Sequence, residues 1–272
     1  MATAAVNGVE LYYKEAGTGP PVLLIHGTGI DADTWGPIYD ELVRDFRTIA
    51  YDRRGFTRSA TTPATSDWKT HGADAAALLR ELDAAPATVV GWSSGGMVAL
   101  DLAVTHPELV SSLVLLETGL HATKHPNRAF LSTWIGAQVA GRRRGPEAAA
   151  DRFMTYTCGY SDGSSAWDQY PEDRKDVLRA NGRAMLTELR AAGKDRHLNA
   201  RTLGALTMPV TIAHGERTQS FFATCARATA KLIPHARSHA IPGGNHALAY
   251  TAPEATAALI RETAGVPVGA AA

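Results

Sequence analysis

Short runs of apolar residues recur along the chain and are separated by turn-forming residues. The runs cover residues 9–13, 21–25, 48–51, 87–90, 113–116 and 210–213. Runs of this length are too short for helices, and their valine and isoleucine content is typical of strands buried in a sheet. The pattern therefore predicts a set of buried strands spread over most of the chain.

Helical patterns lie between several of these runs. Residues 70–82 carry leucines at positions 78, 79 and 82, residues 97–105 follow a pair of glycines, and a last helix is expected at about 252–264. Strands that alternate with helices are joined by crossover connections, which make the sheet mostly parallel. We therefore expect an α/β fold.

The alternation stops between residues 120 and 203, where helical stretches are split by glycine and proline and no strand is indicated. We interpret this segment as a helical cap over the sheet. The predicted division is a core of residues 1–119 and 204–272 and a cap of residues 120–203, within a single domain. A chain of 272 residues is long enough for such a domain.

Charge and hydropathy narrow the range of partners. Lysine plus arginine and aspartate plus glutamate number 27 each, and no long run of one sign would attract nucleic acid or an anionic membrane. The run Arg142–Arg144 is interpreted as a solvated helix end before Gly145 and Pro146. No apolar stretch approaches the length of a membrane span. We expect a cytoplasmic protein with no membrane or nucleic-acid partner.

The two cysteines, Cys158 and Cys225, are too few for a disulfide framework or a zinc site, so we expect free thiols. No histidine and carboxylate cluster has the spacing of metal ligands. We therefore expect no metal and no organic cofactor. The expected partner is a small-molecule substrate, and the sequence leaves open whether the chain forms a homodimer.

The strongest chemical signal is the motif Gly-Trp-Ser-Ser-Gly-Gly at residues 91–96, which follows the run 87–90 and leads into a helix. A serine on a tight strand-to-helix turn needs small residues two positions to either side, because neighbouring elements pack closely against it. Such a turn exposes the hydroxyl at a helix N-terminus, which favours developing negative charge. We predict Ser93 as a nucleophile. The alternative is a glycine-rich turn that only ends a strand.

A second loop follows the run 21–25 and reads His26-Gly27-Thr28-Gly29. Acyl transfer needs two convergent backbone N–H groups where the carbonyl oxygen becomes an oxyanion. We predict that Thr28 and Ser94 supply them. Taken alone, a His-Gly loop is also typical of phosphate-binding loops and of plain turns.

His246 follows Gly243, Gly244 and Asn245 in a loop that comes after a short strand-like run and just before the last predicted helix. An imidazole titrates near neutrality and suits the role of general base for a serine. A surface or capping role is expected for most of the other histidines, including His71, His106, His121, His125, His197 and His235.

Together these motifs resemble the α/β-hydrolase fold superfamily, across about residues 9–264. The segment Asp52–Ser59 adds to the likeness because it resembles the family's aspartate-arginine-glycine loop, with Thr57 where a glycine is usual. The resemblance implies an eight-stranded, mostly parallel sheet and a helical cap that shapes the substrate pocket.

The triad acid of this family often follows the penultimate strand, at a position that here holds Thr218. A hydroxyl can orient an imidazole but cannot offset its charge. Glu117 directly ends the run 113–116, where some family members carry the acid, and we predict that it replaces the aspartate. Glu216 lies on the usual loop but is expected to point away. The alternative role for Glu117 is a strand-end carboxylate that binds loop amides or a cap arginine.

These residues predict a serine hydrolase that cleaves an ester, thioester or lactone through an acyl-enzyme. Epoxide hydrolases and haloalkane dehalogenases are disfavoured because they use an aspartate where this chain has Ser93. The alternative is a non-hydrolytic enzyme of the same fold, such as a lyase, a cyclase or a cofactor-independent oxygenase, that uses a His-carboxylate pair. A binding protein without activity is least favoured. Trp92, Trp134 and Tyr156 are predicted to contact substrate, although cap aromatics serve equally well as core.

Overall fold

The computed structural model describes residues 2–63, 65, 67–120, 124, 127–190 and 195–266. A single sheet runs through it in the order β1-β2-β4-β3-β5-β6-β7-β8. The β1–β2 and β2–β4 pairs are antiparallel and the remaining pairs are parallel. The strands are β1 (Ala2–Val6), β2 (Val9–Ala16), β3 (Pro21–Ile25), β4 (Arg47–Tyr51), β5 (Ala87–Trp92), β6 (Val110–Leu116), β7 (Val210–Gly215) and β8 (Arg237–Ile241). The prediction of an eight-stranded, mostly parallel sheet is confirmed.

The six apolar runs lie in interior strands. No run was predicted at β1, and β8 was indicated only by a short strand-like run before the loop that holds His246. Each predicted run lies within a strand, and β3 has the predicted bounds. The missed strand β1 is short and rich in alanine, and all but the last residue of β8 are exposed. Edge strands bury few side chains, so they carry little of the hydrophobic signal that identifies a central strand.

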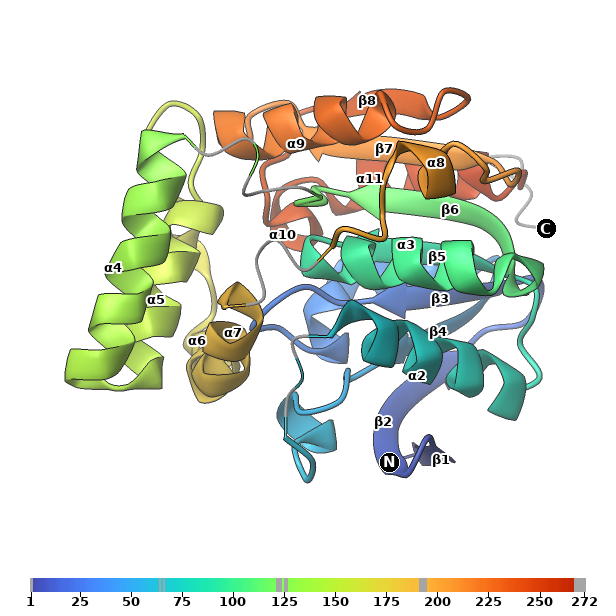
Figure 1. Cartoon of the computed structure of the whole chain (residues 1–272), viewed down its shortest axis with the longest axis horizontal. Helices are drawn as coiled ribbons and strands as arrows, with labels where there is room; N and C mark the ends of the chain where they lie inside the picture. The colour runs from blue at the N-terminus through green and yellow to red at the C-terminus, as the bar shows by residue number, and fades with distance from the viewer. Residues whose placement is uncertain are drawn as a thin grey trace.

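Helices cover both faces of the sheet (Figure 1). Leu23 and Ile25 of β3 join one hydrophobic cluster with α2 (Trp68–Glu81) and α3 (Ser94–Thr105). Val22 and Leu24 join another with α1 (Gly36–Leu42) and α11 (Pro253–Thr263). Alternate side chains of a strand point to opposite faces, and each buried aliphatic side chain contributes about 1.5–3 kcal/mol. The two clusters therefore hold the ends of the parallel strands in fixed positions.

Every named element between β6 and β7 is a helix. The segment contains α4 (Arg128–Arg144), α5 (Pro146–Thr157), η5 (Trp167–Gln169), α6 (Glu172–Ala180), α7 (Gly182–Leu189) and α8 (Ala200–Leu203). Helices α4 and α5 stand together on the side toward which β6 points (Figure 1). The carboxyl ends of parallel strands commonly carry the functional loops of an α/β fold. The helical segment thus lies next to those loops.

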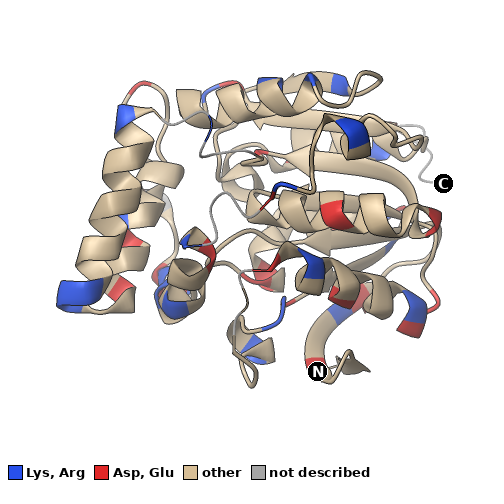
Figure 2. Ribbon diagram, viewed as in Figure 1, with Lys and Arg blue, Asp and Glu red and all other residues tan. Residues whose placement is uncertain are grey.

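The remaining elements connect or terminate the larger ones. They are η1 (Ala32–Trp35), η2 (Thr57–Ser59), η3 (Pro107–Leu109), α9 (Ser220–Ala230) and α10 (Leu248–Thr251). Acidic and basic residues are interspersed over the ribbon, and the exposed run Arg142–Arg144 forms the last turn of α4, as predicted (Figure 2). Within the described residues, each helix is too short or too polar to cross a bilayer. Cys158 and Cys225 are buried free thiols.

Candidate active site

Ser93 occupies a tight turn between β5 and α3. Its φ is 56° and its ψ −119°, a conformation that residues with a side chain rarely adopt. The flanking glycines make this turn possible. A Cβ at Gly95 would lie 2.2 Å from the carbonyl oxygen of Ile25, and one at Gly91 would lie 2.6 Å from Gly96 Cα. The predicted strand-to-helix turn is therefore present, with the serine at its apex.

Glu117 occupies the equivalent position after the neighbouring strand. Trp92 of β5 pairs with Leu116 of β6, so Ser93 and Glu117 directly follow two paired residues. Glu117 also has a positive φ, 54°, and its N–H donates to Ala213 of β7 at 2.8 Å. Adjacent strands lie about 4.8 Å apart. The register of the sheet thus places this carboxylate one strand away from the serine.

The Glu117 side chain is fully buried and accepts three hydrogen bonds. The donors are the N–H of Gly215 at 2.5 Å, Thr218 Oγ1 at 2.9 Å and His246 Nδ1 at 3.1 Å. A buried carboxylate is costly unless its oxygens have such partners. Thr218, at the position where the sequence led us to expect the family's acid, donates a hydrogen bond to Glu117.

His246 lies in the loop between β8 and α10 and is held on several sides. Its backbone carbonyl accepts a hydrogen bond from Trp92 Nε1 at 2.9 Å, and its ring stacks on Phe222 with centroids 3.9 Å apart. With Nδ1 facing Glu117, Nε2 is the nitrogen free to accept a proton. Ser93 and His246 line the same pocket without a direct hydrogen bond between them. Such bonds often tighten only when substrate is bound.

Glu216 lies away from this group. Its side chain is exposed, and Oε2 accepts a hydrogen bond from the N–H of Gly243 at 3.3 Å. Of the two glutamates weighed from the sequence, Glu117 is the one that contacts His246.

Thr28 and Ser94, predicted to bind the oxyanion, lie beside each other. Their hydroxyl oxygens are 2.8 Å apart, and Thr28 lines the same pocket as Ser93. Ser94 is the first residue of α3, so its N–H has no carbonyl partner within the helix. The structure thus brings Thr28 and Ser94 into contact through their side chains, next to Ser93.

The pocket above Ser93 has mostly apolar walls. Ile30 and Trp92 come from the core, and Phe153, Met154 and Tyr170 come from the helical segment. No aspartate, glutamate, lysine or arginine is among its lining residues in the described part of the chain. An environment of this kind disfavours a charged group, because a desolvated charge without a partner is costly.

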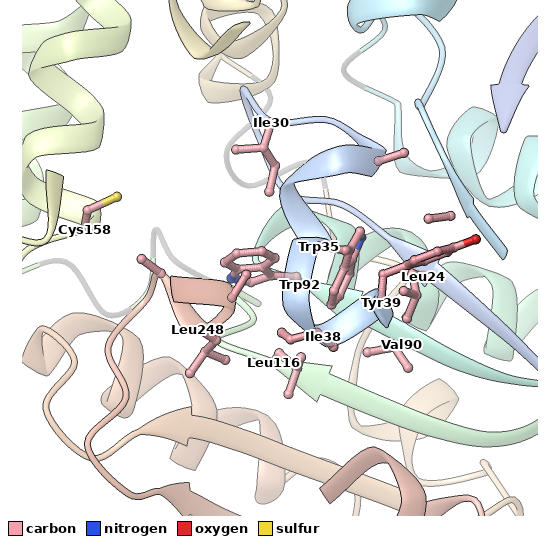
Figure 3. Close-up of a cluster of buried hydrophobic side chains, with 14 of the residues drawn as sticks. Leu24, Ile30, Trp35, Ile38, Tyr39, Val90, Trp92, Leu116, Cys158 and Leu248 are labelled. Atoms are coloured by element: carbon pink, nitrogen blue, oxygen red, sulfur yellow. The ribbon is translucent and has the colours of Figure 1, made fainter. Parts of the chain in front are cut away.

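The helical segment between β6 and β7 also reaches this pocket through Cys158 (Figure 3). The figure shows Trp92 between Trp35 and Cys158, and the rings of Trp92 and Trp35 have centroids 5.4 Å apart. Burial raises the pKa of the Cys158 thiol to about 12, so the thiol is neutral at physiological pH.

The three residues predicted to contact substrate have different surroundings. Trp92 lines the pocket, whereas Trp134 and Tyr156 are not among its lining residues. Trp134 Nε1 donates to the carbonyl of Leu189 at 3.0 Å, and Tyr156 packs against a small cluster that contains Phe222. Substrate contact by Trp134 and Tyr156 stays a prediction.

A buried charged group next to this site was not identified from the sequence. Arg53 and Glu188 form an ion pair at 2.5 Å and are both shielded from solvent. Burial favours a raised pKa for Glu188, but the Arg53 charge and hydrogen bonds outweigh it, so the pKa is lowered. Arg53 lies in the segment Asp52–Ser59 noted from the sequence, but for Glu188 the signal was the spacing of Asn181, Met185 and Glu188, which puts them on one helix face.

The expected surface role is wrong for His71, which is buried close to this group. Its Nε2 lies 3.7 Å from Glu188 Oε1. Burial, with a further contribution from Arg53, lowers the pKa of His71 to about 4. His121 and His125 lie outside the described residues.

The chain matches the family described as alpha/beta hydrolase fold over residues 20–253. This match covers most of the chain, so the protein belongs to that family. The family resemblance drawn from the sequence motifs is therefore confirmed.

Two groups of curated relatives are similar over part of the chain. The uncharacterised hydrolase YraK of Bacillus subtilis is 37% identical over 127 residues, which cover 46% of this chain and 47% of YraK. The putative non-heme bromoperoxidase BpoC of Mycobacterium tuberculosis is 42% identical over 112 residues, which cover 40% and 42%. The chain spans less than half the length of these relatives.

Solved structures are similar over nearly the whole chain. A thermophilic esterase from Thermogutta terrifontis is 26% identical with a TM-score of 0.75, covering 96% of this chain and 95% of the esterase. The solved structure of BpoC is 26% identical with a TM-score of 0.71, and the match covers 95% of this chain and 97% of BpoC. These neighbours and the family match support an enzymatic function.

Proposed function

We propose that the protein is a serine hydrolase that cleaves an ester-like bond of a small molecule through an acyl-enzyme. The observation that carries this proposal is the hydrogen bond between His246 Nδ1 and Glu117 Oε2 at 3.1 Å, one strand away from Ser93. A nucleophile, a base and an oriented carboxylate are the parts that acyl transfer requires. The replacement of the usual acid by Thr218 is then no defect, because the carboxylate comes from β6.

In the proposed mechanism, Ser93 attacks the carbonyl carbon while His246 Nε2 takes the hydroxyl proton. Glu117 holds the imidazole in the tautomer with the proton on Nδ1 and offsets the imidazolium charge. The backbone N–H groups of Thr28 and Ser94 bind the oxyanion. His246 then protonates the leaving group, and a water molecule activated by the same imidazole releases the acid.

The proposed substrate is an uncharged ester, thioester or lactone with a small apolar group next to the reacting carbon. The apolar walls formed by Ile30, Phe153 and Met154 support this choice, since a charged group would be desolvated there without a partner. The similarity to an esterase at 26% identity also favours an ester bond.

The test is intact-mass analysis after reaction with a fluorophosphonate, which modifies an activated serine whatever the natural substrate. Wild type is expected to gain one adduct and Ser93→Ala none. Ser132→Ala, which changes an exposed serine on α4, serves as the matched control and is expected to label like wild type. An unlabelled wild type with an accessible pocket contradicts the acyl-enzyme mechanism.

The hydrogen bond between His246 and Glu117, beside a Ser93 that lines the same pocket without bonding to His246, favours a second candidate. This is a non-hydrolytic reaction in which His246 and Glu117 move a substrate proton and Ser93 only donates a hydrogen bond. Activity of Ser93→Ala toward the natural substrate distinguishes the two. Loss of all turnover supports the hydrolase, and a merely weakened turnover supports the second candidate.

A further inference from the structure

Helix α7 of the cap rests on the loop that follows β3. Asn181 precedes α7, and Met185 and Glu188 follow it by four and seven positions, so all three lie on one helix face. Asn181 Nδ2 donates to the carbonyl of Gly29 at 3.2 Å, and a Cβ at Gly29 would lie 3.8 Å from Met185 Cβ. This face therefore packs on the loop that contains Thr28.

Asn181 also fixes a second loop at the same edge. Thr57 has a φ of 38° where the family usually has a glycine. Its N–H donates to Asn181 Oδ1 at 3.0 Å, and Asn181 Nδ2 donates to its hydroxyl at 2.8 Å. One side chain at the start of α7 thus holds both loops against the cap.

Glu188 contacts both residues assigned to the oxyanion hole. The hydroxyl of Thr28 donates to Glu188 Oε2, and Ser94 Oγ donates to the same oxygen at 3.1 Å. Thr28 belongs to the loop after β3 and Ser94 to α3, so one carboxylate oxygen joins two separate elements. Their backbone N–H groups must converge on one point to bind an oxyanion.

Arg53 neutralises the negative charge of Glu188 next to the predicted oxyanion hole. Its Nη1 lies 2.5 Å from Glu188 Oε1, and its Nη2 donates to Glu188 Oε2 at 3.2 Å and to Ser94 Oγ at 3.1 Å. An unpaired buried carboxylate would oppose the negative charge that develops on the substrate. With Arg53 in place, Glu188 can orient its neighbours without that penalty.

We propose that Glu188 is a positioning residue that completes the oxyanion hole from the cap. This inference rests on the proposed function, because it concerns the same reaction. Glu188 acts through Thr28 and Ser94 and does not touch the substrate. Since it belongs to α7, a shift of the cap would release both oxyanion donors, and the rate of acyl transfer depends on how the cap is seated.

The first test compares Thr28→Val with Thr28→Ser. Valine keeps the branched shape but loses the hydroxyl, whereas serine keeps the hydroxyl. Thr28→Val is expected to lower kcat and the rate of Ser93 labelling about 10- to 100-fold with little change in KM, because preorganised donors act mainly on the transition state. Thr28→Ser loses the methyl group from the pocket but keeps the hydroxyl, and its kcat is expected to fall clearly less than that of Thr28→Val.

The second test changes the carboxylate itself. Glu188→Gln replaces a charged acceptor by a weaker neutral one and is expected to lower kcat. The double variant with Thr28→Val is expected to lose less than the product of the two single losses, because both act on the contact between Thr28 and Glu188. Arg174→Met is the matched control. It removes another ion pair between cap and core, Arg174 Nη2 to Asp31 Oδ1 at 2.7 Å, and is expected to keep kcat.

Equal kcat in Thr28→Val and Thr28→Ser, or an equal loss in Arg174→Met and Glu188→Gln, would overturn the inference. Failure of the proposed function shows separately, as a wild type that is not labelled at Ser93. In that case the positioning role is tested by the rate of amide hydrogen exchange at residues 27–30. Faster exchange in Glu188→Gln than in Arg174→Met supports the positioning role, and equal exchange in both overturns it.

Discussion

Two buried glutamates contact the candidate catalytic residues, and their partners differ. Glu117, at the end of β6, binds the neutral donors Gly215 and Thr218 together with His246. Glu188, on α7 of the helical segment between β6 and β7, is paired with the permanent cation Arg53. Both carboxylates are almost completely excluded from solvent.

This difference in hydrogen-bond and ion-pair partners suits the two glutamates to different roles. A carboxylate paired with an arginine stabilises a transient imidazolium only weakly, because its charge is already neutralised. The same ion pair holds the neighbouring groups firmly in place. A carboxylate held by neutral donors keeps its charge available for the imidazolium that forms during proton transfer. In the proposed mechanism, the end of β6 therefore takes part in the chemistry, and α7 holds the helical segment and the loops together.

The largest expected effect is a loss of kcat when the Glu117 carboxylate is removed. Glu117→Gln keeps the size of the side chain but can favour the wrong tautomer of His246 and cannot offset its charge. We expect kcat for a small ester to fall by about 10³- to 10⁴-fold. Glu216→Gln, on the exposed neighbouring loop, is the control and should stay within about twofold of wild type. A loss in Glu216→Gln as large as in Glu117→Gln would contradict the assignment of the acid.

The second effect is a difference between Glu188→Gln and Glu117→Gln in the free energy of unfolding. Glu188→Gln leaves the Arg53 charge buried without its counter-ion, which costs about 3–5 kcal/mol in the free energy of unfolding. Glu117→Gln leaves no such cation and should cost clearly less. Urea denaturation of both variants measures the difference. A smaller loss in Glu188→Gln than in Glu117→Gln would remove the basis for treating the first as an anchor.

The third effect is a pH dependence that belongs to the region around α7. The pKa of His71 is about 4 in the folded chain and about 6.5 when unfolded. Between these values the unfolded state binds a proton that the folded state does not, so stability falls as the pH drops from about 6.5 to 4. The loss is on the order of 3 kcal/mol. His71→Gln should flatten this slope in denaturation curves measured from pH 7 to 4, and an unchanged slope would assign it to other groups.

The candidate catalytic residues around β6 could be predicted from the sequence, whereas the ion pair beneath α7 could not. Ser93, His246 and Glu117 each follow a strand or precede a helix within a recognisable local motif, so chain order alone narrowed the choice. Glu188 has no such motif, because its role depends on contacts with Thr28, Ser94 and Arg53, which are far away in the chain.

The same limit explains the misassigned histidine and the weak signal of the edge strands. His71 lies in a helix of mixed composition, and a single polar residue gives no sign of which face is buried. The edge strands β1 and β8 bury few side chains, so neither contains one of the six apolar runs. Local pattern predicts interior strands and motifs well, whereas burial of a lone polar residue is set by packing between distant segments.

The smallest effect tests whether position or residue identity makes Glu117 the acid. Thr218 Oγ1 lies 2.9 Å from Glu117 Oε2. Thr218→Asp in wild type would set two carboxylates side by side, and their repulsion should slow turnover at pH 7. In a Glu117→Gln background the same substitution supplies the only carboxylate near His246, and kcat should rise about tenfold above that of Glu117→Gln. One substitution is therefore expected to act with opposite sign in two backgrounds. A loss in both would mean that a carboxylate on the loop after β7 cannot reach the imidazole in this chain, and that the acid has to come from β6.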